Sequence, residues 1–203
     1  MNDDMPPYWA RARRALSASD PVLGEIIRAR PGKFLLSRSD PFVSLARSIV
    51  GQQISVKAAQ SVWERFSATA PTLEPHAVAK LDQTTLRSCG LSARKAEYIG
   101  GLARGFLDGS LRPRSWAELD DEAVIAELTL VKGIGRWTAE MFLMFHLLRP
   151  NVLPLADVGL QRAMNLHYNQ GRALSARKIK TIAARWQPWC SVATWYMWRS
   201  LEN

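Results

Sequence analysis

The stretch Leu130–Phe142, "LVKGIGRWTAEMF", places two glycines one residue apart, directly before an apolar helical segment. Glycine readily adopts positive φ angles and leaves its backbone N–H uncovered. The first turn of a helix also carries unpaired N–H donors and a partial positive charge. Gly133 and Gly135 therefore fit a cradle for an anion such as a phosphate group. The basic neighbours Lys132 and Arg136 favour this interpretation, although a tight turn between helices also uses such glycines.

Metal and disulfide chemistry find little support in the residue types. The only cysteines are Cys89 and Cys190, whereas an all-cysteine zinc site or a cysteine-ligated iron–sulfur cluster needs four thiolates. The histidines, His76, His146 and His167, are not paired at metal-ligand spacing. We interpret each as an ordinary packed or surface histidine, and we expect neither a protein-bound transition metal nor a disulfide framework.

The charge balance indicates a polyanionic partner. Lys and Arg total 27 against 18 Asp and Glu, which gives a net charge of +9 and an isoelectric point near 10.1. Nucleic acid is the first candidate and an anionic membrane surface the second, while general solubility is the plain alternative. No apolar run is long enough to span a bilayer, and the start "MNDDMPPYW" does not read as a signal peptide. We expect a cytoplasmic protein, without a membrane partner, that associates with the nucleoid when bound to DNA.

The elements that must position these residues are predicted to be helical. Apolar residues recur at three- and four-residue spacing, and no strand alternation of useful length occurs. Helix starts are expected at Asp40-Pro41, Ser55, Ser92 and Asp120. The segment 136–148 is apolar on nearly every side, which predicts a central buried helix. Further helices are expected over 158–168, 175–186 and 189–200, with loops after 30, near 70–75 and at 108–118.

Four segments, in this order, resemble the characteristic segments of the helix–hairpin–helix DNA base-excision glycosylases: "FVSLARSIVGQQISVKAAQSVWERF", "GLSARKAEYIGGLA", "LVKGIGRWTAEMF" and "VLPLADVGLQRAM". The chain looks most like the 3-methyladenine DNA glycosylase II branch, over roughly residues 40–200. The resemblance implies an all-α, two-lobed glycosylase domain over 1–203, without the amino-terminal β domain of longer members. One lobe would comprise 41–156 and end in the hairpin, and the other would combine 1–40 with 157–203.

The resemblance assigns catalysis to Asp157. The family cleaves the N-glycosidic bond of a damaged base that is flipped out of duplex DNA. A carboxylate beside the sugar can stabilise the positive charge of an oxocarbenium-like transition state. Capping of a helix that begins at Val158 is the structural alternative, and local sequence alone favours it. Lyase-competent relatives carry a lysine where this chain has Trp137, so we expect no Schiff base and a monofunctional enzyme that leaves an abasic site.

Aromatic residues at matching positions suggest how the base is selected. Alkylated purines such as 3-methyladenine and 7-methylguanine are cationic, and electron-rich rings attract cations by roughly 0.5–2 kcal/mol. The resemblance places Trp137 and Trp198 in the base pocket, and Met141, one turn after Trp137, would line the same wall. Core packing is the alternative for the tryptophans. In the loop "GQQIS", Gln53 matches the residue that fills the gap left by the flipped base. Gln52 is expected to be structural and to satisfy backbone groups inside the protein.

The partner implied by the resemblance is duplex DNA that contains a damaged base, bound by a monomer. The expected DNA-contacting residues are Gln53, Lys132, Gly133, Gly135, Arg136 and Thr138. A monovalent cation, Na⁺ or K⁺, is implied at the backbone carbonyls of Thr129, Val131 and Ile134. No cofactor is needed for the chemistry, and no iron–sulfur cluster is expected.

Two other functions remain open from the sequence. A helix–hairpin–helix module that binds DNA without catalysis would explain the charge, the hairpin and the helices, but it would leave Asp157 without a role. A glycosylase of the same architecture that acts on uracil, hypoxanthine or an oxidised purine is the other, because pocket shape decides between bases.

Overall fold

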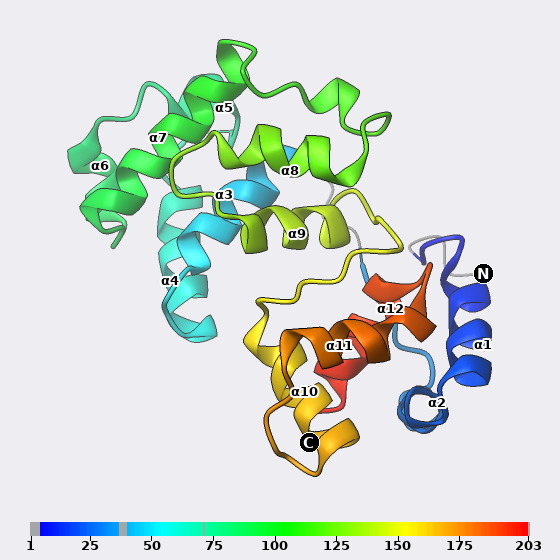
Figure 1. The fold of residues 1–203 in the computed structure, drawn as a ribbon. Helices are drawn as coiled ribbons and strands as arrows, with labels where there is room; N and C mark the ends of the chain where they lie inside the picture. Colours follow the sequence, from blue (N-terminus) through cyan, green and yellow to red (C-terminus); the bar gives the residue numbers. More distant parts are fainter. Residues whose placement is uncertain (1–4, 37–39, 71, 203) are drawn as a thin grey trace. The chain divides into compact units, whose positions relative to one another are not determined.

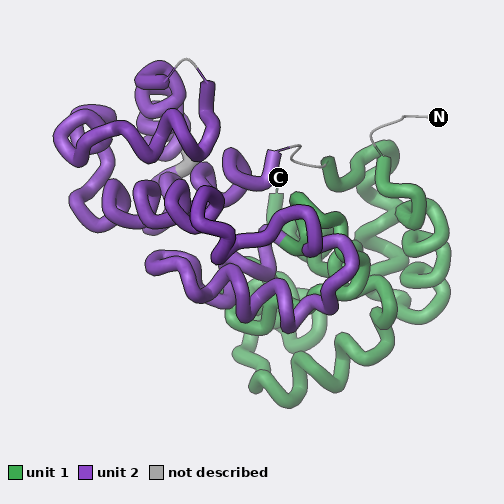
Figure 2. Tube along the Cα trace, turned by 90° about the horizontal axis from the view of Figure 1, so that it is seen from above, with its two compact units in different colours: residues 1–37, 143–203 green, residues 38–142 purple. Residues whose placement is uncertain are grey.

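The computed structural model describes residues 5–36, 40–70 and 72–202, and all regular structure in these ranges is helical, as predicted (Figure 1). The chain divides into two compact units (Figure 2). Unit 1 comprises Met1–Ser37 with Leu143–Asn203, and unit 2 comprises Arg38–Phe142. None of the helices in the described ranges is long and apolar enough to cross a membrane.

Short polar side chains fix where the helices begin. In unit 2 the predicted starts are confirmed at Asp40, Ser55, Ser92 and Asp120, each of which accepts a hydrogen bond from a backbone N–H of the first helical turn. Such a cap stabilises a helix by about 1 kcal/mol. In unit 1, Asp20, Asp157 and Ser175 cap helices in the same way, whereas the N-cap residues Tyr8 and Trp189 make no side-chain cap.

Unit 2 is built around α3 and α7, which pack against each other. Its helices are α3 (Pro41–Gly51), α4 (Val56–Ser67), α5 (Pro75–Val78), α6 (Gln83–Ser88), α7 (Ala93–Leu107), η1 (Pro113–Ser115), α8 (Asp121–Thr129) and most of α9 (Arg136–Phe145). Edge-to-face ring contacts run from Phe42 through Phe106 and Trp116 to Phe142, with centroids 5.2–6.0 Å apart. This aromatic series joins α3, α7 and α9 and so fixes α9, the helix that follows the hairpin.

A buried carboxylate attaches the loop at 108–118 to α8. Glu127 accepts hydrogen bonds from the backbone N–H of Arg112 at 2.6 Å and from Trp116 Nε1 at 2.6 Å. The Arg112 guanidinium lies 2.9 Å from the second carboxylate oxygen. Burial alone would raise the pKa of Glu127, but these hydrogen bonds more than offset it, and the pKa lies below its ordinary value. The loop therefore depends on an ionised Glu127.

Unit 1 has a core rich in aromatic and aliphatic side chains, among them Trp9, Trp186 and Tyr196. Its helices are α1 (Trp9–Ser19), α2 (Pro21–Arg28), α10 (Val158–Asn169), α11 (Ala176–Ala183), η2 (Ala184–Trp186) and α12 (Cys190–Arg199). The helix α12 packs against α1, α2 and α10. Because α12 is buried along nearly all its length, it serves as the central support of this unit.

The boundary between the units differs from the sequence prediction of 156/157. It falls between Phe142 and Leu143, inside α9, and α9 ends at Phe145 rather than at 148. Hydrogen bonds explain why the following segment belongs to unit 1. Ser191 of α12 donates to the carbonyl of Arg149 at 2.5 Å and accepts from the backbone N–H of Val152 at 2.9 Å. The sequence pattern contains no sign of these contacts.

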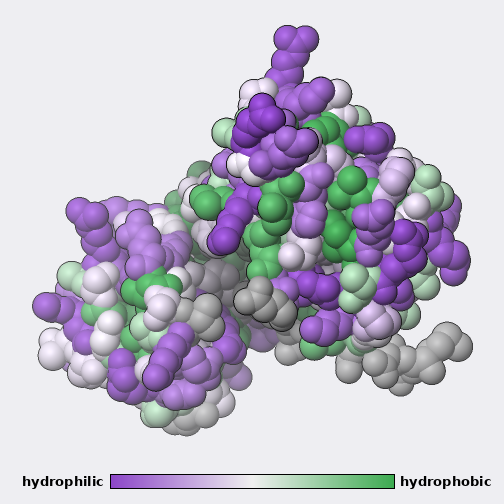
Figure 3. Space-filling model, turned by 90° about the horizontal axis from the view of Figure 1, so that it is seen from below, coloured by the Kyte–Doolittle hydropathy of each residue, from purple (hydrophilic) through white to green (hydrophobic). Residues whose placement is uncertain are grey.

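Most of the face shown in Figure 3 is hydrophilic, with smaller groups of apolar side chains between the polar ones. Scattered exposed apolar residues are normal on proteins. Two of them adjoin residues that the sequence singled out: Leu130 precedes the hairpin, and Val158 follows Asp157.

Candidate active site

The two hairpin glycines have different physical roles. Gly133 has a φ of +93°, and a Cβ atom added there would lie 2.2 Å from Cδ2 of Tyr98. The position therefore needs glycine both for its backbone conformation and for the ring packed over it. Gly135 is exposed, its φ does not lie in the left-handed region, and a Cβ would meet nothing within 4 Å. Local packing thus makes no demand for glycine at 135, where the bare backbone is open to a ligand.

The two cationic residues beside the glycines are paired with carboxylates. Lys132 Nζ lies 2.7 Å from Glu97 Oε1, and this hydrogen bond raises the pKa of Lys132. The guanidinium of Arg136 forms a two-pronged ion pair with Glu122, which raises its pKa, and its Nε lies 3.1 Å from Glu140 Oε1. A phosphate group would have to compete with these carboxylates for either cation.

The loop between α3 and α4 is anchored from two sides. Gln52 donates from Nε2 to the carbonyl oxygen of Gly133 at 2.9 Å, so its expected structural role is confirmed. Lys95 donates from Nζ to the carbonyls of Val50 at 2.8 Å and Gln52 at 2.7 Å, and burial lowers its pKa. The next residue, Gln53, is exposed and has a φ of +57°. The anchors hold Gln53 at the tip of the loop in a conformation that few non-glycine residues adopt.

Asp157 is the N-cap of α10, as local sequence favoured. Its Oδ1 accepts a hydrogen bond from the backbone N–H of Leu160 at 2.6 Å and another from Trp198 Nε1 at 2.7 Å. The residue is 8% exposed. A carboxylate at the start of a helix is also stabilised by the helix dipole. Capping does not exclude catalysis, because an anchored carboxylate can still present charge to a ligand.

The side chain of Trp198 is fixed on two sides within unit 1. Its ring stacks on Phe145, with centroids 5.9 Å apart and an interplanar angle of 8°. Its pyrrole edge faces Gly159, where an added Cβ would lie 3.0 Å from Trp198 Cδ1 and 3.1 Å from Asp157 Oδ1. Trp198, predicted to contact the base, is thus also a direct hydrogen-bond partner of Asp157.

The remaining predicted pocket and DNA residues lie in unit 2, along the first turns of α9. Trp137 is 43% exposed, whereas Met141, one turn further, is buried. The predicted burial of this helix on nearly every side is therefore wrong at its first turn. Thr138 is 4% exposed, so its side chain is buried, and its contact with DNA stays a prediction. Its backbone N–H is the only donor at this position that still suits that role.

The three carbonyls expected to bind a monovalent cation belong to the last residue of α8 and to the turn between α8 and α9. The carbonyl oxygen of Val131 accepts the amide of Ile134 at 3.0 Å, which closes the turn, and both side chains are buried. Thr129, at the end of α8, donates its hydroxyl to the carbonyl of Ile125 at 2.8 Å, so the hydroxyl is already engaged within the helix. Neutral carbonyl oxygens suit a hard cation, so the donor set fits such an ion.

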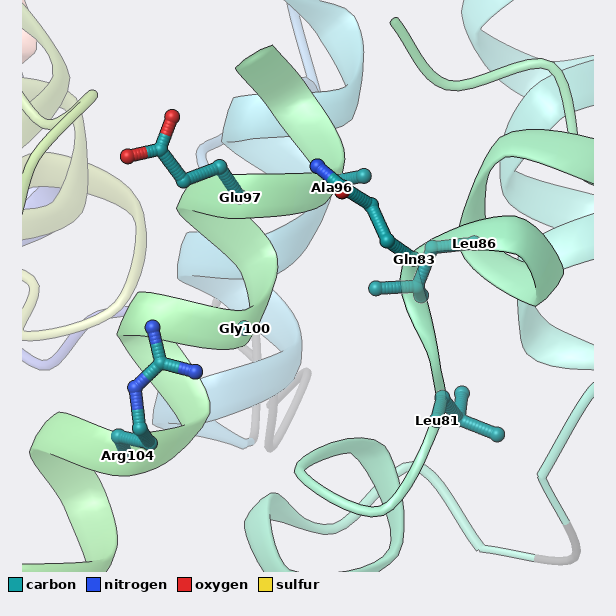
Figure 4. A pocket seen from close by; sticks show the side chains of 7 residues that line it. All are labelled: Leu81, Gln83, Leu86, Ala96, Glu97, Gly100 and Arg104. Carbon is teal, nitrogen blue, oxygen red and sulfur yellow. The ribbon is translucent and has the colours of Figure 1, made fainter. Parts of the chain in front are cut away.

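Two small hollows of unit 2 lie along α7 and share Arg104 in their linings. The first, of about 220 Å³, is lined by Leu81, Gln83, Leu86, Ala96, Glu97, Gly100 and Arg104 (Figure 4). The second, of about 240 Å³, includes Arg104, Leu130 and Lys132 in its lining. Neither contains Asp157, Trp137 or Met141, so neither is the expected base pocket.

Comparison with known proteins defines the class. The family described as "HhH-GPD superfamily base excision DNA repair protein" matches residues 46–189. The chain belongs to this superfamily, and the resemblance read from the sequence is confirmed.

Individual relatives extend the comparison. The chain is 31% identical to the putative DNA-3-methyladenine glycosylase YfjP of Bacillus subtilis over 188 residues. The matched region covers 89% of this chain and 66% of that protein. The crystal structure of DNA-3-methyladenine glycosidase from Bacillus halodurans matches with a TM-score of 0.85 and 34% identity, over 95% of this chain and 89% of that one. Schizosaccharomyces pombe 3-methyladenine DNA glycosylase (Mag1), solved in complex with abasic DNA, matches with a TM-score of 0.83 and 26% identity, over 95% and 97%.

Several residues that shape the site were not predicted from the sequence. The amine of Lys95 turns inward to the end of α3, and the sequence pattern gives no sign of this contact. Glu97 and Glu122, which pair with the hairpin cations, gave no signal because their partners are distant in sequence. Gly159 gave no usable signal either, because it lies in the first turn of α10, where the helix-interior cost of glycine does not apply.

Proposed function

We propose that the protein is a monofunctional DNA glycosylase that excises alkylated purines, of the 3-methyladenine and 7-methylguanine type, from duplex DNA in base excision repair. It would act as a monomer on a flipped-out base, hydrolyse the N-glycosidic bond and leave an abasic site. The names of the B. subtilis, B. halodurans and S. pombe relatives support the substrate class.

The observation that supports catalysis most directly is the anchored carboxylate of Asp157. Cleavage of the N-glycosidic bond develops positive charge on the deoxyribose, and a carboxylate held in advance next to that charge lowers its energy without rearranging. The N–H of Leu160 and the indole of Trp198 fix Asp157 Oδ1 before any ligand arrives. The same carboxylate can help to orient the attacking water.

The hairpin would bind the DNA backbone without reading its sequence. The exposed backbone at Gly135 and the N-terminal turn of α9 offer N–H donors to a phosphate, and Lys132 and Arg136 add positive charge. A Na⁺ or K⁺ ion at the carbonyls of Thr129, Val131 and Ile134 would supply further positive charge to that phosphate. No step of the reaction requires such an ion or any other cofactor.

Trp137 gives the proposed reaction its monofunctional character and part of its selectivity. Indole cannot form a Schiff base with the sugar, so water remains the nucleophile. Its exposed ring in unit 2 offers an electron-rich face to a cationic base. The alkylated base needs no protonation by the enzyme, because its positive charge already makes it a good leaving group. Gln53, at the tip of its loop, is the residue we assign to the gap in the base stack.

Product analysis with methylated duplex DNA tests the proposal. The purified protein should release free methylated purines and leave abasic sites, and borohydride should trap no covalent protein–DNA complex. Binding without release would favour a non-catalytic helix–hairpin–helix module. Release of uracil, hypoxanthine or an oxidised purine, with methylated bases left in place, would reassign the substrate class.

A further inference from the structure

We propose that Trp198 is a positioning residue for Asp157, and that its indole N–H, rather than base stacking alone, is what the reaction needs from it. Phe145 and Gly159 complete the arrangement, because one supports the ring and the other leaves space for the contact. This inference rests on the proposed function, since it concerns how the carboxylate is prepared for a cationic sugar.

The hydrogen bonds to Oδ1 define the orientation of the carboxylate. Leu160 N–H approaches at 2.6 Å along the helix start, and Trp198 Nε1 approaches at 2.7 Å from α12, 41 residues later in sequence. A cap alone fixes a side chain relative to its own helix. The second donor ties Asp157 to a different helix, so the carboxylate cannot rotate about its χ angles without breaking a hydrogen bond to a charged group.

Gly159 explains why the indole can approach so closely. Any larger residue at 159 would bring a Cβ to 3.0 Å from Trp198 Cδ1, 3.1 Å from Asp157 Oδ1 and 3.2 Å from Trp198 Nε1. These distances are shorter than ordinary van der Waals contacts, so a Cβ would push the donor and acceptor apart. Gly159 is the second residue of α10. Its presence here is accounted for by the Asp157–Trp198 contact.

Phe145 restricts the indole from its flat side. The parallel stacking at 5.9 Å and 8° leaves the ring little freedom to tilt, so the N–H direction is set by packing. The carboxylate is therefore oriented by a rigid aromatic pair. Rigid support of this kind is what a preorganised charge requires, because a mobile carboxylate loses part of its stabilising effect to rearrangement.

A second aspartate in the same unit offers a built-in comparison. Asp20 caps α2 and also accepts an indole N–H, from Trp186 Nε1 at 3.1 Å. It further accepts the hydroxyl of Tyr168 at 2.8 Å and is 0% exposed. Because Asp20 is fully buried, it can stabilise the fold but cannot contact a ligand, whereas Asp157 is 8% exposed and remains partly accessible. Trp186→Phe is thus a matched control that removes the same kind of hydrogen bond away from the proposed site.

Duplexes with two abasic analogues separate carboxylate positioning from base stacking, because neither analogue contains a base. One carries neutral tetrahydrofuran, and the other carries a protonated pyrrolidine that mimics the charge of the transition state. The wild-type protein should prefer the cationic analogue, and Asp157→Asn should remove the preference. Trp198→Phe, which retains an aromatic ring on Phe145 but lacks the donor, should reduce the preference about 10- to 100-fold, as expected for one hydrogen bond to a charged group.

The controls make each outcome decisive. Trp186→Phe should lower the melting temperature yet keep the preference. Gly159→Ala should reduce the preference by the separate route of steric displacement, which provides a test even if Trp198→Phe folds poorly. If Trp198→Phe and Gly159→Ala both keep the wild-type preference while Asp157→Asn loses it, the positioning role is overturned and the glycosylase proposal stands. If Asp157→Asn itself keeps the preference, the catalytic assignment fails and the positioning role fails with it.

Discussion

Substituting Gly133 by alanine should destabilise the hairpin through two separate effects. The backbone there has a φ of +93°, and a non-glycine residue held in a disfavoured region costs about 1–3 kcal/mol. The new methyl group would also lie 2.2 Å from the ring of Tyr98, and crowding in a packed region costs about 1–3 kcal/mol more. The sum is about 2–6 kcal/mol, which in a chain of this size corresponds to a fall in melting temperature of roughly 5–20 °C.

Gly135→Ala is the matched variant, because it adds the same methyl group without strain or clash. We expect its stability to stay within about 1 kcal/mol of the wild type. Its affinity for an abasic duplex should nevertheless fall about tenfold, since the methyl group keeps a phosphate from the bare amides. Thermal unfolding followed by circular dichroism and DNA binding followed by fluorescence anisotropy measure the two effects. Equal melting of both variants, or unchanged DNA affinity of Gly135→Ala, would refute the division of roles between the glycines.

Four further substitutions address the electrostatics of unit 2. The pKa of Glu127 is lower in the folded protein than its ordinary value of 4.5, so ionised Glu127 stabilises the fold above pH 4.5 and loses this effect as the pH falls through the pKa of the folded state. The variant Glu127→Gln should therefore be less stable at pH 7, and its free energy of unfolding should fall less steeply in acid. Lys95→Met removes the hydrogen bonds that anchor the loop carrying Gln53. Because we assign Gln53 to the gap in the base stack, binding to an abasic duplex should weaken more than binding to an intact duplex. Lys132→Gln should weaken DNA binding equally for all sequences and reduce the slope of log affinity against log salt concentration by about one. Glu97→Gln should strengthen DNA binding, because it releases Lys132 from its ion pair. A loss of affinity that depends on DNA sequence would contradict recognition of the DNA backbone.

Local rules were sufficient to predict most helices between residues 41 and 200. Capping residues such as Asp40, Ser55 and Ser92 act on backbone groups within three residues, so their effect is visible in the sequence. The short helix α6 was not predicted, because six residues are too few for a periodic apolar pattern. The end of unit 2 was also misplaced, since contacts between Ser191 and residues about 40 positions earlier decide it.

The candidate site shows the same limit. The identity of Asp157 came from a resemblance, and its capping role from a local rule. The contact with Trp198 joins residues 41 positions apart. The sequence therefore predicts Trp198 only as part of the base pocket, and its role as a hydrogen-bond donor to Asp157 is visible only in the structure. The burial of the Thr138 side chain was likewise not predicted, because the sequence does not show which face of the first turn of α9 packs inward.

The most direct test of the central claim is the single-turnover rate of base release by Asp157→Asn from a duplex with one 7-methylguanine. Asparagine keeps the size of the side chain and an oxygen that can accept the N–H of Leu160, but it carries no charge. We expect DNA affinity and melting temperature close to those of the wild type and a rate of release lower by about 100-fold or more. A rate equal to that of the wild type, measured on a variant that binds and melts normally, would contradict the account.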